Sequence, residues 1–288
     1  MKWPALGHNN TASSCRYGVT QLSTNLLIGA DPEFFVRRKN HWISGHIFDC
    51  GTKTHPKPMM MGKCQVDGIA LEINVTPAAS RVRFEANVLG AKQELERFIQ
   101  KTDKDVRLVA KPSIFFGHQR LSKLPEVAAD LGCQPDFNAY EGEVNPRPNK
   151  GSPIRTGAGH IHIGWMKDAN VKSRSHIETC CELTKQLDYY LGLPSLLWDT
   201  DTRRRTLYGQ AGAFRPKPYG LEYRVLSNKW TETRKHIGWV FDQTVKAFRW
   251  WENGVKLDEG YRGFAQTAIN SGLSDWDKTH PDLAKSIL

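Results

Sequence analysis

The chain has 288 residues, of which 39% are hydrophobic and 24% charged, so it can bury a core and is not a low-complexity or collagen-like polymer. Its 40 Lys and Arg residues outnumber its 30 Asp and Glu residues, which gives a formal net charge of +10. Because the sequence contains neither an apolar run of the ~18 to 20 residues that span a bilayer nor an apolar N-terminal leader, it predicts a cytoplasmic protein without a membrane partner.

The positive charge leaves two kinds of partner open. Lys and Arg side chains that neutralise phosphates bind nucleic acids, and they also attract anionic small molecules such as nucleotides. The charge is dispersed along the chain, and its densest cluster, 203–205, lies in a Gly-rich stretch without a helix-turn-helix, RNP or zinc-finger pattern. A nucleic-acid-binding protein without catalysis is therefore the less favoured alternative.

The first part of the chain predicts strands. Residues 1–25 are polar and aperiodic, which indicates an N-terminal arm or flap preceding a single domain of residues 26–288. Strands are predicted over 26–36, 42–48 and 69–75, where β-branched and aromatic residues are enriched.

Helices and strands then alternate. Phe84, Val88, Ala91, Leu95 and Phe98 recur at intervals of three or four, which predicts an amphipathic helix. The further predicted elements are strands over 106–116, 160–165 and 221–226 and helices over 172–191 and 232–252. The irregular segment 117–157 is long enough to predict a lid or substrate-binding insertion, and 253–288 is predicted to be a C-terminal extension.

This order of elements predicts an α+β fold, with an antiparallel or mixed sheet, helices packed on one face and the active site on the other. The parallel, doubly wound alternative is weaker, because neither Gly-x-Gly-x-x-Gly nor Gly-x-x-x-x-Gly-Lys-Ser/Thr occurs in the sequence.

Four predicted strands share one pattern, in which polar residues two positions apart lie on the face opposite the apolar residues. The pairs are Asp31 with Glu33, Glu72 with Asn74, His160 with His162, and Glu222 with Arg224. Any one pair fits the solvated face of a half-covered sheet. Together on neighbouring strands, however, the carboxylates would repel one another without a cation, and Mg²⁺ or Mn²⁺ prefers such oxygen ligands.

Cationic residues occur immediately before the last of these strands. Arg205, Arg215 and Lys217 lie on a Gly-rich segment that could close over bound phosphates, and Arg224 lies two residues after Glu222. Metal ions that bridge phosphate oxygens, together with Arg and Lys, are the recurring parts of phosphoryl-transfer sites.

Four segments of the sequence carry a resemblance to a known superfamily. They are Gly29-Ala30-Asp31-Pro32-Glu33, the run from Val66 to Asn74, Gly159-His160-Ile161-His162-Ile163-Gly164, and the run from Tyr208 to Arg224. In this order they resemble the carboxylate-amine ligases (amidoligases) of the glutamine synthetase and γ-glutamylcysteine synthetase superfamily, and in particular the phage-encoded COOH-NH2 ligase branch.

The resemblance implies a fold of the glutamine synthetase catalytic type and a role for each matched residue. The implied metal ligands are Asp31, Glu33, Asp67, Glu72, His160 and Glu222. The implied nucleotide-binding residues are His162 and Arg224, and the Gly-rich segment adds Arg205, Arg215 and Lys217 as candidates for the same role. The implied catalytic residues are Arg215, Arg224 and Glu33.

The implied reaction is ATP-dependent formation of an amide or isopeptide bond with two or three Mg²⁺ or Mn²⁺ ions. ATP phosphorylates a carboxylate, an amine attacks the acyl phosphate, and phosphate leaves. The substrates would be small-molecule or peptide carboxylates and amines, and Glu141 or Glu143 is a candidate to hold the amine. A metal-dependent phosphotransferase on the same scaffold is an alternative that the sequence leaves open, and the sequence does not determine whether the protein forms an oligomer. A phage-encoded protein would act in the host cytoplasm.

Overall fold

The computed structural model describes residues 25–129, 136–146, 151–255 and 257–287. The predicted arm, 1–25, lies outside these residues except for its last position, and the predicted lid is described only in part. Within the described residues, no helix combines the length and the apolar character needed to cross a membrane.

A large antiparallel sheet organises the described chain, with the strand order β3-β4-β5-β1-β10-β12-β11-β8. These strands are β1 (Leu27–Arg38), β3 (Lys57–Met59), β4 (Gly62–Asp67), β5 (Ala70–Ala78), β8 (Phe137–Asn138), β10 (Gly159–Gly164), β11 (Ala213–Lys217) and β12 (Gly220–Tyr223). The far end of β1 also pairs with β2 (His41–Ile43) and β6 (Val106–Val109). The fold is therefore α+β, as the sequence predicts.

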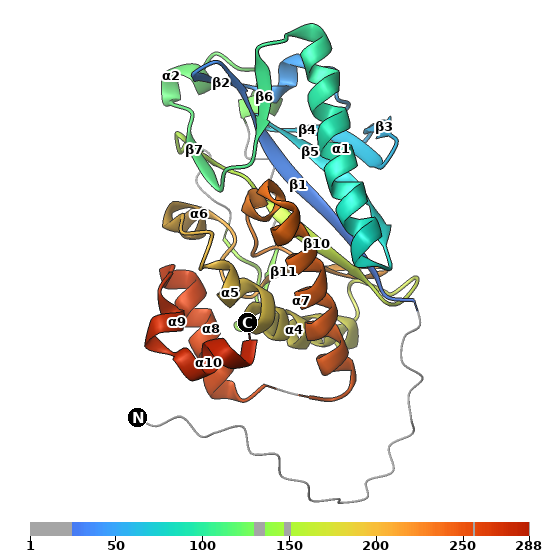
Figure 1. The fold of residues 1–288 in the computed structure, drawn as a ribbon, viewed down its shortest axis with the longest axis vertical. Helices are drawn as coiled ribbons and strands as arrows, with labels where there is room; N and C mark the ends of the chain where they lie inside the picture. Colours follow the sequence, from blue (N-terminus) through green and yellow to red (C-terminus); the bar gives the residue numbers. More distant parts are fainter. Residues whose placement is uncertain (1–24, 130–135, 147–150, 256, 288) are drawn as a thin grey trace, which may run out of the picture.

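Three long helices pack along the apolar side of this sheet (Figure 1). They are α1 (Arg81–Thr102), α4 (Arg174–Leu187) and α7 (Arg234–Glu252). Ser80 is the N-cap of α1, and its side chain accepts a hydrogen bond from the Arg83 amide. Thr233 is the N-cap of α7, and its side chain accepts a hydrogen bond from the His236 amide. Such N-caps satisfy amide groups that have no partner within the helix.

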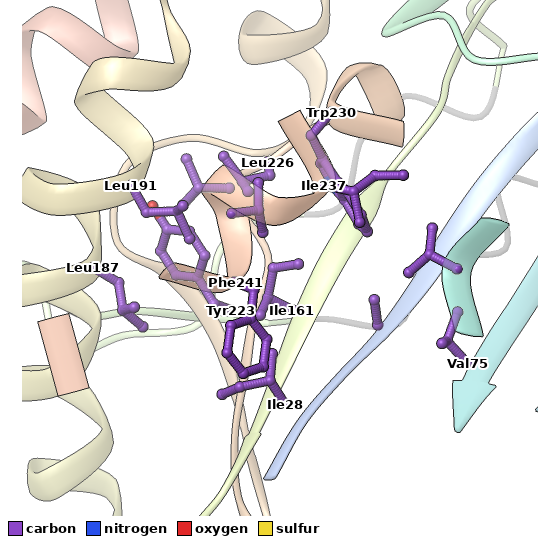
Figure 2. Packing of buried hydrophobic residues seen from close by; sticks show 14 of the residues in the cluster. Ile28, Val75, Ile161, Leu187, Leu191, Tyr223, Leu226, Trp230, Ile237 and Phe241 are labelled. Atoms are coloured by element: carbon purple, nitrogen blue, oxygen red, sulfur yellow. The ribbon is translucent and has the colours of Figure 1, made fainter. Parts of the chain in front are cut away.

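The core lies between these helices and the sheet. Figure 2 shows Ile28, Ile161 and Tyr223 of the sheet beside Ile237 and Phe241 of α7. All except Phe241 are fully buried, and Phe241 is 6% exposed. Because these residues face the helices, their neighbours one position along each strand must face the opposite side of the sheet.

Shorter elements connect the layers. They are η1 (Gly45–Ile47), β7 (Ser113–Phe115), α2 (His118–Leu121), α3 (Glu126–Ala129), β9 (Ile154–Thr156), η2 (Asp188–Gly192), α5 (Leu193–Ser195), α6 (Thr202–Leu207) and η3 (Asn228–Glu232). At the C-terminus, α8 (Glu259–Ser271), α9 (Trp276–Thr279) and α10 (Pro281–Ile287) gather at the end of the molecule away from β2 and α2 (Figure 1).

Some predicted elements differ from the structure. The strand predicted over 42–48 ends at Ile43, because the chain turns into η1, where Gly45 donates a hydrogen bond to the Ile69 carbonyl. A Cβ atom at Gly45 would lie 2.8 Å from Leu71 Cγ, so this close approach requires glycine. The strand predicted over 106–116 is divided into β6 and β7, and Pro112, which cannot donate a ladder hydrogen bond, lies between them.

The segment 117–157 is also more regular than the sequence indicates. Its described residues contain α2, α3, β8 and β9, and β9 pairs with β7. The sequence prediction missed the β3–β4 hairpin, since Lys57–Met59 contains a proline and shows no clear alternation.

Candidate active site

A cavity of about 340 Å³ opens on the face of the sheet opposite the long helices. Side chains from β1, β4, β5, β10, β11 and β12 line it, together with residues from four connecting segments. The lining residues are Asp31, Glu33, Lys53, Gln65, Asp67, Glu72, Asn74, His160, His162, Tyr208, Arg215, Lys217, Tyr219, Glu222 and Arg224. Every site residue predicted from the sequence is in this set, except Arg205 and the two candidate amine-binding residues Glu141 and Glu143.

The register of the sheet brings these side chains together. Asp31 on β1 lies opposite His160 on β10, and Glu33 lies opposite Glu72 on β5. Glu222 on β12 lies between His162 on β10 and Arg215 on β11. Because residues opposite one another in antiparallel strands are close neighbours on the same face, these five strands form one continuous polar wall.

The first cluster of potential metal ligands comprises Asp31, His162 and Glu222, whose ligand atoms all lie within 4.8 Å of one another. His162 Nε2 is 3.1 Å from Asp31 Oδ2, and its Nδ1 is 2.5 Å from the Tyr219 hydroxyl. Burial alone would raise the pKa of Asp31, but the two imidazoles outweigh burial and hold the pKa well below its usual value. Asp31 is therefore anionic and available to a cation.

His160 lines the same cavity and contacts two carboxylates of the first cluster. Its Nδ1 lies 3.0 Å from Asp31 Oδ1 and 3.5 Å from Glu222 Oε1, and its Nε2 is 3.4 Å from the Tyr208 hydroxyl. Burial and then the Arg224 charge lower its pKa, which favours the neutral imidazole. Both imidazoles therefore contact Asp31, and His162 belongs to the first cluster while His160 lines the cavity beside it.

The second cluster comprises Glu33, Asp67 and Glu72, again with ligand atoms within 4.8 Å of one another. Burial, followed by repulsion from Asp67, raises the pKa of Glu33 to about 8. Burial and the neighbouring carboxylates also raise the pKa of Glu72 well above its usual value. Three carboxylates so close together are electrostatically unfavourable unless a cation joins them.

Two buried polar atoms beside this cluster have no hydrogen-bond partner among the described residues. They are Asp67 Oδ1 and Asn74 Nδ2. An orphaned carboxylate oxygen is a ready ligand for a hard cation, and an orphaned amide is a ready donor to an anionic oxygen. The donor sets of both clusters, oxygen-rich with one imidazole, therefore fit Mg²⁺ or Mn²⁺.

Three cationic side chains surround Glu222, which is fully buried. Lys217 Nζ lies 2.7 Å from Glu222 Oε2, Arg215 Nη1 lies 3.4 Å from Oε1, and Arg224 Nη1 also contacts Oε1. Arg224 Nε is in addition 3.0 Å from Asp136 Oδ2. Three cationic groups thus converge on this end of the cavity, an arrangement that is suited to an anion such as phosphate.

Arg205, expected to bind nucleotide, does not line the cavity. It is buried, donates to the Asp201 carbonyl, and forms an ion pair with Asp199 at 3.5 Å. Its neighbour Arg204 donates to the carbonyls of Val225 and Leu226. The arginine cluster therefore anchors the chain that leaves β12.

Several lining residues were missed by the sequence reasoning. Tyr208 and Tyr219 belong to the segment that carries the resemblance, but nothing in the sequence pattern indicated that these two aromatic side chains line the cavity. Lys53 lies in a connection with no periodic pattern, and Gln65 lies on the missed strand β4. Glu141 and Glu143, considered as amine-binding residues, are exposed and do not line the cavity.

A second, mostly apolar cavity of about 360 Å³ adjoins the first. It is lined by Leu27, Gly29, Ala30, Asn74, Val75, Pro77, His162, Gly164 and Tyr219. Asn74, His162 and Tyr219 line both cavities, so the polar and apolar spaces meet at these three side chains.

Comparison with known families gives one match. Residues 152–239 match the family model described as "Phage phiEco32-like COOH.NH2 ligase-type 2". The matched segment contains β10, β11 and β12, and therefore His162, Arg215 and Glu222, whereas β1, β4 and β5 precede it. The match supports a carboxylate-amine ligase activity. A search of curated proteins finds no match.

Proposed function

We propose that this protein is an ATP- and divalent-metal-dependent carboxylate-amine ligase of the glutamine synthetase type. The observation that carries the proposal is the cavity wall, where two clusters of metal-ligand type adjoin an anion-binding group of Arg215, Lys217 and Arg224. The family match over 152–239 supports the ligase class independently of this geometry.

The two clusters would each hold a divalent ion. Asp31, His162 and Glu222 would bind one, and Glu33, Asp67 and Glu72 the other. When bound, such ions offset the repulsion between a substrate carboxylate and the terminal phosphate of ATP. The positions of these side chains determine where those oxygens can bind, because the register of five strands holds the side chains on one wall.

The cationic residues would act on the phosphoryl group as it is transferred. Arg215, Lys217 and Arg224 reach Glu222 from β11 and from the residue after β12, so their donors are already oriented before substrate binds. Preorganised donors of this kind stabilise developing negative charge, and loss of one typically costs about 10²-fold or more in rate.

The apolar cavity would accept the nucleotide base. Its volume of about 360 Å³ and its lining by Leu27, Val75 and Pro77 suit a planar, weakly polar group. The phosphates would then pass Asn74 and His162, where the two cavities meet, towards the clusters. The orphaned Asn74 amide would donate to a phosphate oxygen on this path.

The reaction follows from the chemistry of carboxylates. A carboxylate oxygen attacks the terminal phosphorus of ATP, the bond to ADP breaks, and an acyl phosphate forms. An amine then attacks the acyl carbon and inorganic phosphate leaves with the oxygen, so that amide, ADP and phosphate are the products. Phosphorylation supplies the leaving group that a free carboxylate lacks in water.

Hydroxylamine tests this function without knowledge of the natural amine, because it converts acyl phosphates into hydroxamates. The purified protein is incubated with ATP, Mg²⁺ or Mn²⁺, hydroxylamine and a panel of mono-, di- and amino-carboxylic acids. We expect hydroxamate and ADP in equal amounts with at least one acid, both abolished by EDTA and by Glu72→Gln. The control Glu178→Gln changes an exposed glutamate of α4 and should retain activity.

Other outcomes distinguish the alternatives. A stable phosphorylated product without hydroxamate would identify a metal-dependent phosphotransferase instead. Salt-sensitive binding to DNA or RNA that is unchanged by Glu72→Gln, with no ADP release from any acid, would favour the nucleic-acid-binding protein.

A further inference from the structure

Lys53 extends into the second cluster from a tight turn outside the main sheet strands. The turn is closed by hydrogen bonds in both directions between Thr52 and His55, each 3.1 Å long. Gly51 begins the turn with φ of +81°, and a Cβ atom there would lie 2.5 Å from the His55 carbonyl oxygen. The Gly51 carbonyl accepts a hydrogen bond from Val66 on β4, which fixes the turn beside Asp67.

The Lys53 ammonium is placed among the three carboxylates of this cluster. Its Nζ lies 2.9 Å from Asp67 Oδ2. Lys53 also lines the same cavity as Glu33 and Glu72, the other two carboxylates of the cluster. A cation from the chain itself therefore offsets part of the repulsion that burial and proximity create.

The same ammonium belongs to a side chain that is partly open to solvent. The Lys53 side chain is 47% exposed, whereas Asp67 is only 11% exposed. Rotation of the flexible lysine stem would carry the charge into water, while the hydrogen-bonded turn and β4 remain in place. The carboxylates, held by the three strands β1, β4 and β5, would stay preorganised for another cation.

We propose that Lys53 is a built-in counter-ion of the Glu33, Asp67 and Glu72 cluster, which stabilises the metal-free protein and is displaced when a divalent ion binds there. This inference rests on the proposed metal-dependent function. It follows that Lys53 competes with the metal. Its side chain lowers the affinity of this cluster for a divalent ion and stabilises the metal-free protein.

Manganese binding to Lys53→Met tests the proposal, because methionine keeps the length and apolar stem of lysine without its charge. We expect Lys53→Met to bind Mn²⁺ at this cluster about three- to tenfold more tightly than the wild type, in titrations followed by calorimetry and by the EPR signal of free Mn²⁺. The metal-free variant should melt at a lower temperature, and saturating Mn²⁺ should widen the gap between the metal-free and metal-bound melting temperatures.

Two further variants make the result specific. Lys63→Met removes an exposed lysine from the same strand as Asp67 without touching the cavity, and should bind Mn²⁺ as the wild type does. In a Glu72→Gln background, which weakens the cluster itself, the effect of Lys53→Met on Mn²⁺ affinity should disappear.

Unchanged or weaker Mn²⁺ binding by Lys53→Met, in a wild type that does bind Mn²⁺, would overturn the role of Lys53 and leave the proposed ligase intact. Unchanged Mn²⁺ affinity with weakened ATP binding would make Lys53 a substrate ligand instead. A wild-type protein that binds no Mn²⁺ would overturn both the counter-ion and the metal-dependent function.

Discussion

The two arginines at the cavity, Arg224 and Arg215, contribute differently to the stability of the metal-free protein. Arg224 is buried between Asp136 and Glu222, so its guanidinium is the partner of two buried carboxylates. Arg215 is 24% exposed and lies 3.4 Å from Glu222, to which Lys217 is closer. Removing one partner from a buried ionic network is costly because it leaves uncompensated charge.

Arg215→Ala is therefore expected to lower turnover by about 10²-fold while changing the free energy of unfolding by less than about 1 kcal/mol. Arg224→Ala should cost about 3–5 kcal/mol of stability as well as activity. Urea denaturation and the hydroxamate assay measure the two quantities. Equal destabilisation by the two substitutions would contradict this division of roles.

Glu33→Gln separates the metal site from the fold. Glu33 is one of three crowded carboxylates, and its Oε2 accepts a 2.9 Å hydrogen bond from the Ala158 amide, which a glutamine oxygen can also accept. Without metal, the variant should be as stable as the wild type or more stable by about 1 kcal/mol, since one repelling group is removed.

With saturating Mn²⁺, the same variant should gain roughly half or less of the wild-type rise in melting temperature, because stabilisation by a ligand follows its affinity for the folded state. Differential scanning calorimetry with and without Mn²⁺ gives both comparisons. If Mn²⁺ raised the melting temperature of Glu33→Gln as much as that of the wild type, Glu33 would not be a metal ligand.

At the scale of single elements, the π-helical turn η2 holds β12 in position from the side of the helices. Asp188 is buried in this turn and accepts hydrogen bonds from the Tyr223 hydroxyl at 2.7 Å and from the Gly212 amide at 2.6 Å. Tyr223 adjoins Glu222 on β12, and Gly212 immediately precedes β11. One carboxyl group in the helical layer thus fixes the two strands that carry the cationic residues.

This carboxyl group makes stability dependent on pH. Burial raises the pKa of Asp188 to about 7, although its hydrogen bonds act in the opposite direction. Its contribution to stability is complete below the unfolded pKa of about 4 and is lost as the pH rises through about 7. Asp188→Asn cannot ionise and should therefore gain stability relative to the wild type, by about 2–3 kcal/mol between pH 5 and pH 8.

Urea denaturation of both proteins across this range measures the difference, and Asp282→Asn, at a 98% exposed side chain, should follow the wild type at every pH. If the difference in the free energy of unfolding between Asp188→Asn and the wild type were the same at every pH in this range, Asp188 would keep one ionisation state throughout.

The sequence predicts the elements of this fold best where one face of a strand is apolar. Ile161 and Ile163 alternate with His160 and His162, and this pattern predicts both the strand and the wall on which the imidazoles lie. The pattern cannot show which imidazole belongs to the ligand cluster with Asp31 and Glu222. That depends on side-chain direction and on the Tyr219 hydroxyl, which comes from a hairpin far along the chain.

Elements fixed by distant contacts could not be predicted. β3 has no alternating pattern and exists as the partner of β4, and η1 forms because Gly45 fits against Leu71. Arg205 was expected at the nucleotide because it is close in sequence to Arg215, but its ion pair with Asp199 draws it away from the cavity. Proximity in sequence does not reveal such pairings.

At the scale of the whole molecule, the C-terminal segment predicted as an extension is packed into the body. Trp276 and Ile269 are fully buried, and Arg262 forms a 2.8 Å ion pair with Glu182 of α4. The Asn270 side chain accepts a 2.8 Å hydrogen bond from the Ala211 amide, in the turn that leads into β11. The terminal helices therefore contribute both to the core and to the placement of the cavity wall.

A chain truncated after Asn253 should consequently fail to fold cooperatively, because it loses the buried side chains of α8 and α9 and exposes the surfaces they cover. Loss of a single buried tryptophan alone costs about 3–5 kcal/mol, a large share of the ~5–15 kcal/mol that stabilises a typical domain. Soluble yield and thermal unfolding followed by circular dichroism test this, with Lys285→Ala, at an exposed side chain of α10, as the variant that should behave as the wild type. If the truncated chain melted cooperatively near the full-length temperature, α8 to α10 would be an appendage and the Asn270 contact would have no influence on β11.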